Sequence, residues 1–309
     1  MKKLRFVVSL ITDDNDYQRE QAAAALDAAA RLGVEVETLF ADNDAINQSQ
    51  QLLRIIQTAD AHVDAILVEP ASRTCFPRVA QAAVAAGIGW GALNCEPDYL
   101  RELHSPSYPK SAPVFAVSAD NGQVGRIQGR QLAAILPKGG SVLYILGPSG
   151  SSATEQRAAG MYESKPENVK IKVLKSGNWT EDGGYQAVAS WLRLSTSHKE
   201  QVDAVQAQND FLARGAMKAI QEQTTGEERA TKSRLPLLGV DGLPKTGQEW
   251  VRQRLLTATV IVPPITATAL EVVVAAIRKG MQPPERTLVQ PKSFPEPDAL
   301  GSQVSAYRS

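Results

Sequence analysis

The sequence predicts an α/β protein with two domains, each built on an open parallel sheet. Its 309 residues suffice for about two domains, because a typical domain has roughly 100 to 200 residues. Hydrophobic residues make up 43% of the chain, which is enough for a core in each domain. Short runs of Val, Ile and Leu alternate along the chain with longer helical patterns, and this alternation is typical of βαβ units.

The short apolar runs are expected to be strands, about five in each of two sheets. Each run is followed by polar or turn-forming residues, as expected where a buried strand reaches the edge of a sheet. The expected strands are 4–10, 34–40, 65–69, 88–93, 114–117, 141–146, 169–174, 204–208, 235–240 and 258–262.

The segments between the strands are expected to be helices that cover the sheets. The first one is rich in alanine, which lets a helix lie close to a sheet, and Gly33 suits its C-terminal cap. The expected helices are 17–32, 46–60, 74–86, 121–136, 152–164, 182–195, 210–223, 245–254 and 265–280.

Charge and composition exclude several function classes. Lys and Arg balance Asp and Glu at 33 each and form no long basic run, so no nucleic-acid partner is expected. The cysteines, Cys75 and Cys95, form no CxxC pair, and His62, His104 and His198 lack metal-ligand spacing. No nucleophile elbow or dinucleotide fingerprint is present, so we expect no enzyme, no cofactor and no metal site.

Three further segments have an ordinary structural interpretation. The turn at 147–152 lacks the Lys of a phosphate-binding loop, which favours a tight βα turn with a serine N-cap over a phosphate cradle. The apolar stretch 255–277 contains Pro263 and Pro264 and is expected to be a strand, a turn and a helix instead of a membrane span. The first eleven residues are expected to be a strand instead of a signal peptide, which implies a cytoplasmic chain if Met1 is the native start.

Polar and aromatic residues gather where the expected strands end. Ligands of open α/β sheets bind outside the carboxyl ends of the strands. Carboxylates, amides and guanidinium groups pair with sugar hydroxyls, and an aromatic ring covers the apolar face of a sugar. Taken singly, such residues often have a simpler role, for example Asp210 as a helix N-cap. The candidate ligand-binding residues are Asn15, Asp16, Tyr17, Glu69, Asn94, Arg157, Trp179, Asn209 and Asp241.

Four sequence blocks also resemble a known family. The segment 205–210, VQAQND, followed by Gly215 and Ala216, resembles a block of ribose-binding protein and its relatives. Similar blocks are GVDGLP at 239–244, SADN at 118–121 with Gly125, and GSSA at 150–153 with Arg157. Their order holds across nearly the whole chain, which therefore resembles type I periplasmic sugar-binding proteins, a fold shared with lac-repressor-type effector domains.

The resemblance implies two doubly wound lobes joined by a three-crossing hinge, with crossings near residues 118, 262 and 290. One lobe would comprise 1–118 and 263–290, and the other 119–262 and 291–309, with the ligand cleft between them. Hinge closure would capture a small sugar or polyol for an ABC transporter permease. A monomer in the periplasm is the expected state.

The resemblance also assigns roles to particular residues. Tyr17 and Trp179 would pack on the sugar from the two lobes, while Arg157, Asn209 and Asp241 would hydrogen-bond its hydroxyls. The chain departs from its relatives at four site positions, which argues against ribose as the ligand. These departures are Asn94 for Asp, Glu69 for Asn, Cys95 for Arg and Val262 for Gln.

Two other function classes stay open on the sequence. A cytoplasmic sensor of the same fold, signalling to a protein partner, is the main alternative. An enzyme would need a carboxylate pair such as Glu69 and Asp241, but the resemblance places these two on opposite lobes, where they would hold hydroxyls.

Overall fold

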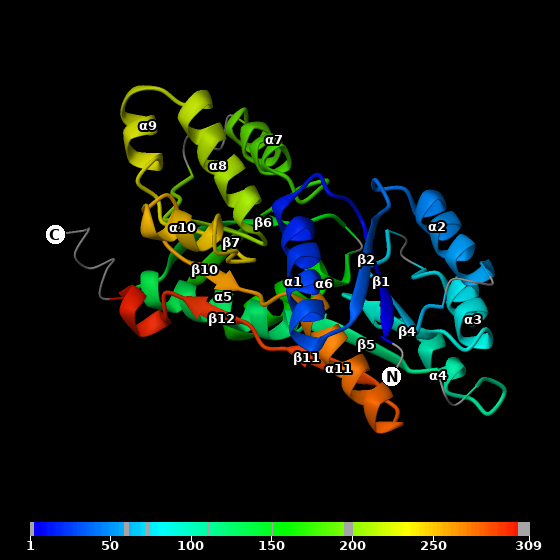
Figure 1. Ribbon diagram of the computed structural model, residues 1–309. Helices are drawn as coiled ribbons and strands as arrows, with labels where there is room; N and C mark the ends of the chain where they lie inside the picture. The colour runs from blue at the N-terminus through cyan, green and yellow to red at the C-terminus, as the bar shows by residue number, and fades with distance from the viewer. Residues whose placement is uncertain are drawn as a thin grey trace. The chain divides into compact units, whose positions relative to one another are not determined.

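The computed structural model describes residues 3–58, 62–71, 74–109, 112–149, 151–194 and 200–301. The chain divides into two compact units (Figure 1). Unit 1 comprises Met1–Ala119 and Pro264–Val289, and unit 2 comprises Asp120–Pro263 and Gln290–Ser309, so the chain passes between the units three times. Both units are built on parallel sheets with helices, which confirms the predicted fold class. Within the described part of the chain, no helix is long and apolar enough to cross a membrane.

Unit 1 contains a sheet of six parallel strands in the order β11-β5-β4-β3-β1-β2. The strands are β1 (Arg5–Leu10), β2 (Glu35–Phe40), β3 (Ala65–Val68), β4 (Gly89–Leu93), β5 (Val114–Ala119) and β11 (Arg286–Val289). The central strand β3, with sequence AILV, is buried along its whole length, as expected for a strand covered on both faces.

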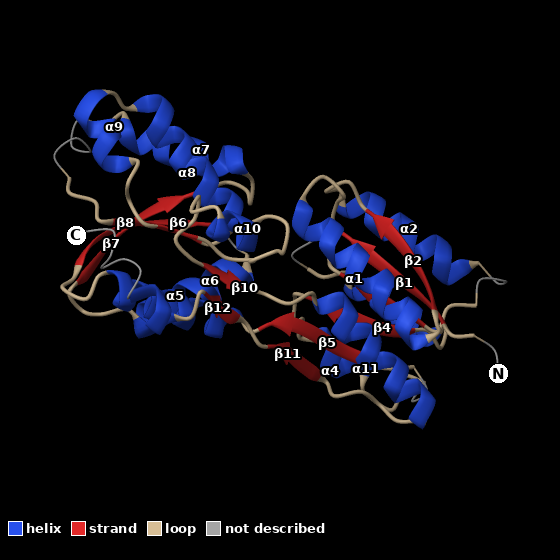
Figure 2. Ribbon diagram, turned by 60° about the vertical axis from the view of Figure 1, so that its left-hand side comes forward, coloured by secondary structure: helices blue, strands red, loops and turns tan. Residues whose placement is uncertain are grey.

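Helices cover both faces of the sheet of unit 1 (Figure 2). Helices α1 and α11 form one core layer with the sheet, and α2, α3 and α4 form the other. Gln21 of α1 ties the first pair together, because its Oε1 accepts hydrogen bonds from the backbone N–H groups of Ile265 and Thr266. These are N–H groups of the first turn of α11, which have no acceptor within the helix. The helices are α1 (Asp16–Leu32), α2 (Ala45–Gln57), α3 (Pro77–Ala85), α4 (Tyr99–Leu103) and α11 (Ile265–Lys279).

Unit 2 contains a sheet of four parallel strands in the order β7-β6-β8-β9 and an antiparallel pair, β10-β12. Isolated parallel bridges link Leu238 to Ala258 and Asp241 to Ile261. The strands are β6 (Gly140–Leu146), β7 (Val169–Lys175), β8 (Ala204–Ala207), β9 (Leu237–Leu238), β10 (Thr259–Ile261) and β12 (Lys292–Phe294).

The helices of unit 2 also form two layers, with α5 and α6 in one core cluster and α7 and α8 in the other. Each pair packs backbone against backbone through glycine. A Cβ on Gly125 of α5 would lie 2.1 Å from the carbonyl oxygen of Arg157 in α6, and a Cβ on Gly215 of α8 would lie 1.9 Å from that of Glu181 in α7. The helices are α5 (Asn121–Ile135), α6 (Ser152–Ser164), α7 (Glu181–Leu192), α8 (Asp210–Gln223), α9 (Gly226–Lys232) and α10 (Gly247–Arg252).

Replacing Gly125 with alanine is therefore expected to destabilise the protein. Alanine normally favours a helix over glycine by about 1 kcal/mol. Here the added methyl group overlaps the backbone of α6, and such overpacking costs about 1 to 3 kcal/mol. Urea unfolding should show a net loss of stability. As a control, Gly177→Ala should leave stability unchanged or raise it, because no atom lies within 4 Å of that Cβ. Equal stability of the two variants would contradict the close packing.

The expected elements agree with the structure to within a few residues, with three differences. The sheets have six and four strands instead of about five each, because β11 joins the sheet of unit 1 and β12 pairs with β10. The expected strand 235–240 is reduced to Leu237–Leu238, because Pro236 lacks an N–H and only isolated bridges continue the pairing after Leu238. The short elements α4, α9, β11 and β12 were not expected. Part of helix 46–60, part of helix 182–195 and Gly150 lie outside the described residues.

Candidate functional site

Four side chains of unit 1 form a hydrogen-bonded cluster where β3 and β4 end and α1 begins. We call Tyr17, Gln18, Glu69 and Asn94 the unit 1 cluster. The Nδ2 of Asn94 donates to the Tyr17 hydroxyl and to Oε1 of Glu69, both at 2.9 Å. The Nε2 of Gln18 donates to Oε2 of Glu69 at 3.0 Å. Both carboxylate oxygens of Glu69 therefore accept from neutral amides.

Glu69 is the most buried candidate residue of unit 1, with 6% of its surface exposed. Burial raises its pKa above the ordinary value, and the hydrogen bonds from Asn94 and Gln18 partly oppose this shift. A second glutamine holds the backbone in place, because Nε2 of Gln48 donates to the Glu69 carbonyl at 2.9 Å. The position of the carboxylate is thus fixed through both its side chain and its main chain.

The raised pKa of Glu69 has a consequence for stability. A carboxyl group whose pKa is higher in the folded state stabilises the fold fully below its unfolded-state pKa, which is ordinarily 4.5. This contribution is lost as the pH rises through the raised pKa. We expect the unfolding free energy of the ligand-free protein to fall with rising pH above 4.5, and Glu69→Gln to remove part of that slope. Urea titrations at a series of pH values measure it, and identical slopes in both proteins would contradict the burial of an ionisable group.

Two candidate residues occupy left-handed backbone conformations. Asn94 has a φ of 53° directly after β4, and Asp241 has a φ of 97°. Asparagine tolerates this region better than most residues, whereas a φ near 97° is strained for any side chain other than glycine. Because strain of this kind gathers at ligand-binding positions, the backbone supports a functional interpretation of Asp241.

Asn15 and Asp16 are engaged at the start of α1. Asn15 is the N-cap, and its Oδ1 accepts from the backbone N–H of Gln18 at 3.0 Å. Asp16 forms an ion pair with Arg19 at 2.6 Å, in which both side chains are exposed. The structure therefore brings Tyr17, Glu69 and Asn94 together, while Asn15 and Asp16 shape the turn that carries Tyr17.

Four candidate residues of unit 2 form a second cluster, at the ends of β8 and β9, on α6 and in the loop between β7 and α7. We call Arg157, Trp179, Asn209 and Asp241 the unit 2 cluster. Arg157 is 3.8 Å from the Asp241 carboxylate and lies over the indole of Trp179, with Cζ 5.6 Å from the ring centroid. The Nδ2 of Asn209 donates to the Trp179 carbonyl at 2.8 Å. The cluster thus combines a paired charge, an aromatic ring and an amide.

The Arg157 guanidinium is held by two further groups. Its Nε donates to Oδ1 of Asn121 at 2.9 Å, and Nη1 donates to the Gln208 carbonyl at 2.5 Å. Only 9% of the Arg157 side chain is exposed. The charge is therefore both buried and fixed in direction, which suits recognition of a small polar ligand.

The N-cap of α8 is not the residue that the sequence suggested. Asn209, not Asp210, is the N-cap of α8, and its Oδ1 accepts from the Leu212 N–H at 2.8 Å. Asp210 is 1% exposed and accepts from the Thr259 hydroxyl at 2.6 Å and the Gly242 N–H at 2.8 Å. Asp210 therefore ties the start of α8 to β10 and to the turn after β9.

The two cysteines lie beside the unit 1 cluster as free thiols. A hydrogen bond joins them, which lowers the pKa of Cys75 and raises that of Cys95. The negative charge of Glu69 also raises the pKa of Cys95. Among the described residues, no group of three or more His, Cys, Asp or Glu side chains is placed to hold a metal ion.

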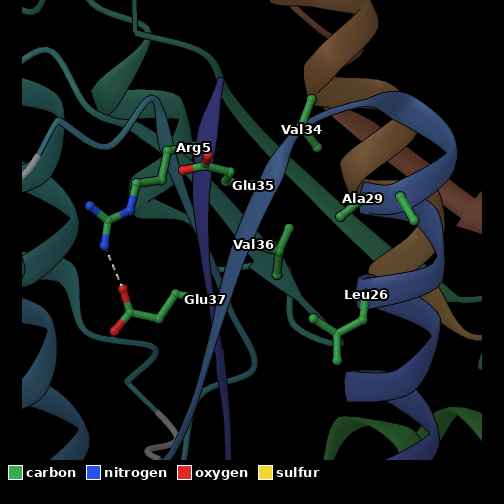
Figure 3. Close-up of a pocket in the computed structure, with 8 residues that line it drawn as sticks. Arg5, Leu26, Ala29, Val34, Glu35, Val36 and Glu37 are labelled. Atoms are coloured by element: carbon green, nitrogen blue, oxygen red, sulfur yellow. Dashed lines mark hydrogen bonds and ion pairs between the residues drawn. The ribbon is translucent and has the colours of Figure 1, made fainter. Parts of the chain in front are cut away.

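A surface concavity of unit 1 lies away from its cluster. About 490 Å³ in volume, it is lined by residues from the amino ends of β1 and β2 and from the last turns of α1. An exposed ion pair between Arg5 and Glu37, at 2.9 Å, forms its polar side (Figure 3). Apart from this ion pair and Glu35, its lining is aliphatic, so we assign the candidate site to the two clusters.

Three supporting residues were not among the predicted site residues. Gln18, Asn121 and Gln208 are all buried and each orients a cluster member or its backbone. Asn121 and Gln208 lie inside the SADN and VQAQND blocks, which was the available signal. Gln18 carries no such signal, because a glutamine at the start of a helix is most often solvated.

Comparison with known proteins identifies the family. A periplasmic binding protein domain matches residues 6–280. The xylitol-binding protein of Mycolicibacterium smegmatis is 26% identical over 212 residues, which cover 68% of this chain and 54% of that protein. The ribose import binding protein of Bacillus subtilis is 25% identical over 236 residues, which cover 76% of this chain and 68% of that protein. The chain thus matches about half the length of the first relative and two thirds of the second.

Solved structures agree on the fold. A periplasmic solute-binding protein from Actinobacillus succinogenes with bound D-allose has a TM-score of 0.80 at 22% identity, covering 97% of this chain and all of that one. The myo-inositol-binding protein of Caulobacter has a TM-score of 0.75 at 22% identity, covering 98% and 97% of the two chains. Since the domain match spans most of the chain and the fold agrees throughout, the protein belongs to the periplasmic binding protein domain family, which is made of binding proteins.

Proposed function

We propose that the protein is a periplasmic solute-binding protein that captures a small sugar or polyol and presents it to an ABC transporter permease. In this proposal the unit 1 cluster and the unit 2 cluster take opposite sides of one ligand, and the units close on it by a hinge. The protein binds without chemical turnover and acts as a monomer.

The observation that carries the proposal is the chemistry of the two clusters. Each lies where parallel strands reach their carboxyl ends, the edge at which open α/β sheets bind ligands. Each combines one carboxylate, amide groups and one aromatic residue, with Glu69 and Tyr17 in unit 1 and Asp241 and Trp179 in unit 2. Carboxylates and amides bind vicinal hydroxyls, and aromatic rings cover the apolar face of a sugar ring.

The relatives support the same ligand class. The xylitol-binding and ribose import binding proteins bind, by their names, a polyol and a pentose. The departures at Glu69, Asn94 and Cys95 favour a ligand other than ribose, because a buried polar site rejects compounds that leave its groups unpaired.

A thermal-shift screen tests the proposal. The purified protein is heated with pentoses, hexoses, polyols, inositols, sugar acids and amino sugars, since a ligand that binds only the folded state raises the melting temperature. One compound class should give a large, saturable shift. The tryptophan fluorescence of the protein should change on binding, and Trp179→Phe should reduce that change. No shift across the panel, or conversion of a compound on prolonged incubation, would contradict the proposal.

A further inference from the structure

Glu69 differs from the other candidate carboxylate in its charge balance. Asp241 in unit 2 faces the Arg157 guanidinium at 3.8 Å. Glu69 in unit 1 receives hydrogen bonds from Asn94 and Gln18, whose amides carry no charge. In the part of the chain that the structure describes, no Lys, Arg or His nitrogen lies within ion-pair distance of Glu69.

Two described arginines of unit 1, Arg19 and Arg286, are engaged with other groups. Arg19 pairs with Asp16 at 2.6 Å and donates to the Asp13 carbonyl at 2.8 Å, and it is exposed. Arg286 pairs with Glu96 at 2.7 Å. Neither cation neutralises Glu69, so the charge on this carboxylate has no partner among the described residues of unit 1.

An ionised carboxylate that is 6% exposed and unpaired is unfavourable, because burial removes its hydration. The raised pKa of Glu69 reflects this loss of hydration, and the negative charge of Glu69 in turn raises the pKa of Cys95. A cation placed against Glu69 would remove this penalty. Tyr17 and Asn94 are half-buried, so the cluster is not sealed from outside.

We propose that the ligand carries a protonated amine that binds Glu69, which makes the preferred ligand an amino sugar or an amino polyol. This inference rests on the proposed function and narrows its ligand class. An ammonium group supplies both the positive charge and N–H donors, and each carboxylate oxygen of Glu69 can accept one bond beyond the one it already has. A neutral polyol supplies donors but leaves the charge uncompensated.

Calorimetric titration with matched ligand pairs tests the proposal. Each pair consists of an amine and its hydroxyl counterpart, namely glucosamine and glucose, galactosamine and galactose, and 1-amino-1-deoxysorbitol and sorbitol. The N-acetylated amino sugars form a third, uncharged arm. For the pair that fits the site, the amine should bind about 10- to 100-fold more tightly than both uncharged compounds, as expected for a charged hydrogen bond.

Variants separate the charge of Glu69 from its structural role. In Glu69→Gln the ratio of amine affinity to hydroxyl affinity should fall to about 1, even if both affinities drop. Glu69→Asp keeps the charge and should keep the preference for the amine. Asp27→Asn removes one exposed carboxylate from the same unit, on α1, and should leave the ratio unchanged. Thermal unfolding of each variant verifies that it is folded.

The outcomes distinguish this inference from the proposed function. If neutral sugars or polyols bind the wild type as tightly as their amines, the charge inference is wrong and the sugar-binding function stands. If the amine still binds more tightly than its hydroxyl counterpart in Glu69→Gln, the proposed role of Glu69 is also wrong. If no member of any pair binds but an uncharged compound of the thermal-shift panel does, the charge inference is wrong and the sugar-binding function stands. If nothing in the pairs or the panel binds, both are wrong.

Discussion

Replacing Arg157 with alanine is expected to lower ligand affinity about 10- to 100-fold and the free energy of unfolding by about 3 to 5 kcal/mol. Both effects have the same origin. The guanidinium faces Asp241, donates to Asn121 and to the Gln208 carbonyl, and is almost entirely buried. Without the guanidinium, the Asp241 carboxylate stays buried but has lost the positive charge of Arg157, which destabilises the fold. The proposed ligand also loses a hydrogen-bond donor that is held in place.

Arg126→Ala is the matched control for this prediction. Arg126 lies on the neighbouring helix α5 and pairs with Glu163 at 3.3 Å at the surface, where the glutamate side chain is 64% exposed. Exposed ion pairs contribute less than about 1 kcal/mol, so this variant should unfold and bind like the wild type. Calorimetry and urea unfolding of both variants measure the contrast. If the Arg157→Ala protein binds the ligand with wild-type affinity, Arg157 does not belong to the binding site.

Asp210→Ala is expected to lower the free energy of unfolding by about 2 to 5 kcal/mol, because it leaves two buried donors without an acceptor and creates a small cavity. The donors are the Thr259 hydroxyl and the Gly242 N–H, which both point at the carboxylate. The Asp210 carboxylate is also tightly packed against two glycines, because a Cβ on Gly239 or Gly247 would lie about 2 Å from its oxygens. Asp210→Asn should cost less than the alanine variant, because one amide oxygen still accepts.

The pKa of Asp210 provides a second measurement. Burial, followed by the charge of Asp241, raises it well above the ordinary 3.8. The stabilisation from this raised pKa is complete below 3.8 and lost as the pH rises through the folded-state pKa. Asp210→Asn should therefore flatten the pH dependence of unfolding in that range. The exposed Asp182→Ala serves as the control and should change neither the slope nor the stability by more than about 1 kcal/mol.

Most of the fold was predictable because its elements have strong local signals. Helix α1 ends where Gly33 adopts a φ of 65°, and α6 and α8 have the bounds expected from their patterns. The elements that the sequence did not reveal are short and depend on distant partners. Strand β11 exists because Arg286–Val289 pairs with the edge of β5, and its four residues show no alternation that identifies them alone.

The candidate site was predictable in residue type and less so in its contacts. Tyr17, Glu69 and Asn94 meet because the ends of parallel strands share one edge of a sheet, which is a property of the fold class. The contribution of Gln18 was not predictable, because glutamine is usually exposed and is engaged here by two groups outside its helix, the Glu69 carboxylate and the Ile11 N–H. The hydrogen bond that engages Asp210 depends on Thr259, which is 49 residues away in sequence.

The central claim is that both clusters hold one ligand, and calorimetry of one variant from each unit tests it most directly. The best ligand from the thermal screen is titrated into the wild type, Tyr17→Ala and Asp241→Ala. The account predicts one site per chain and an affinity loss of about tenfold or more in both variants. A loss confined to one variant, with the other binding like the wild type, would contradict it, because the ligand would then belong to a single unit.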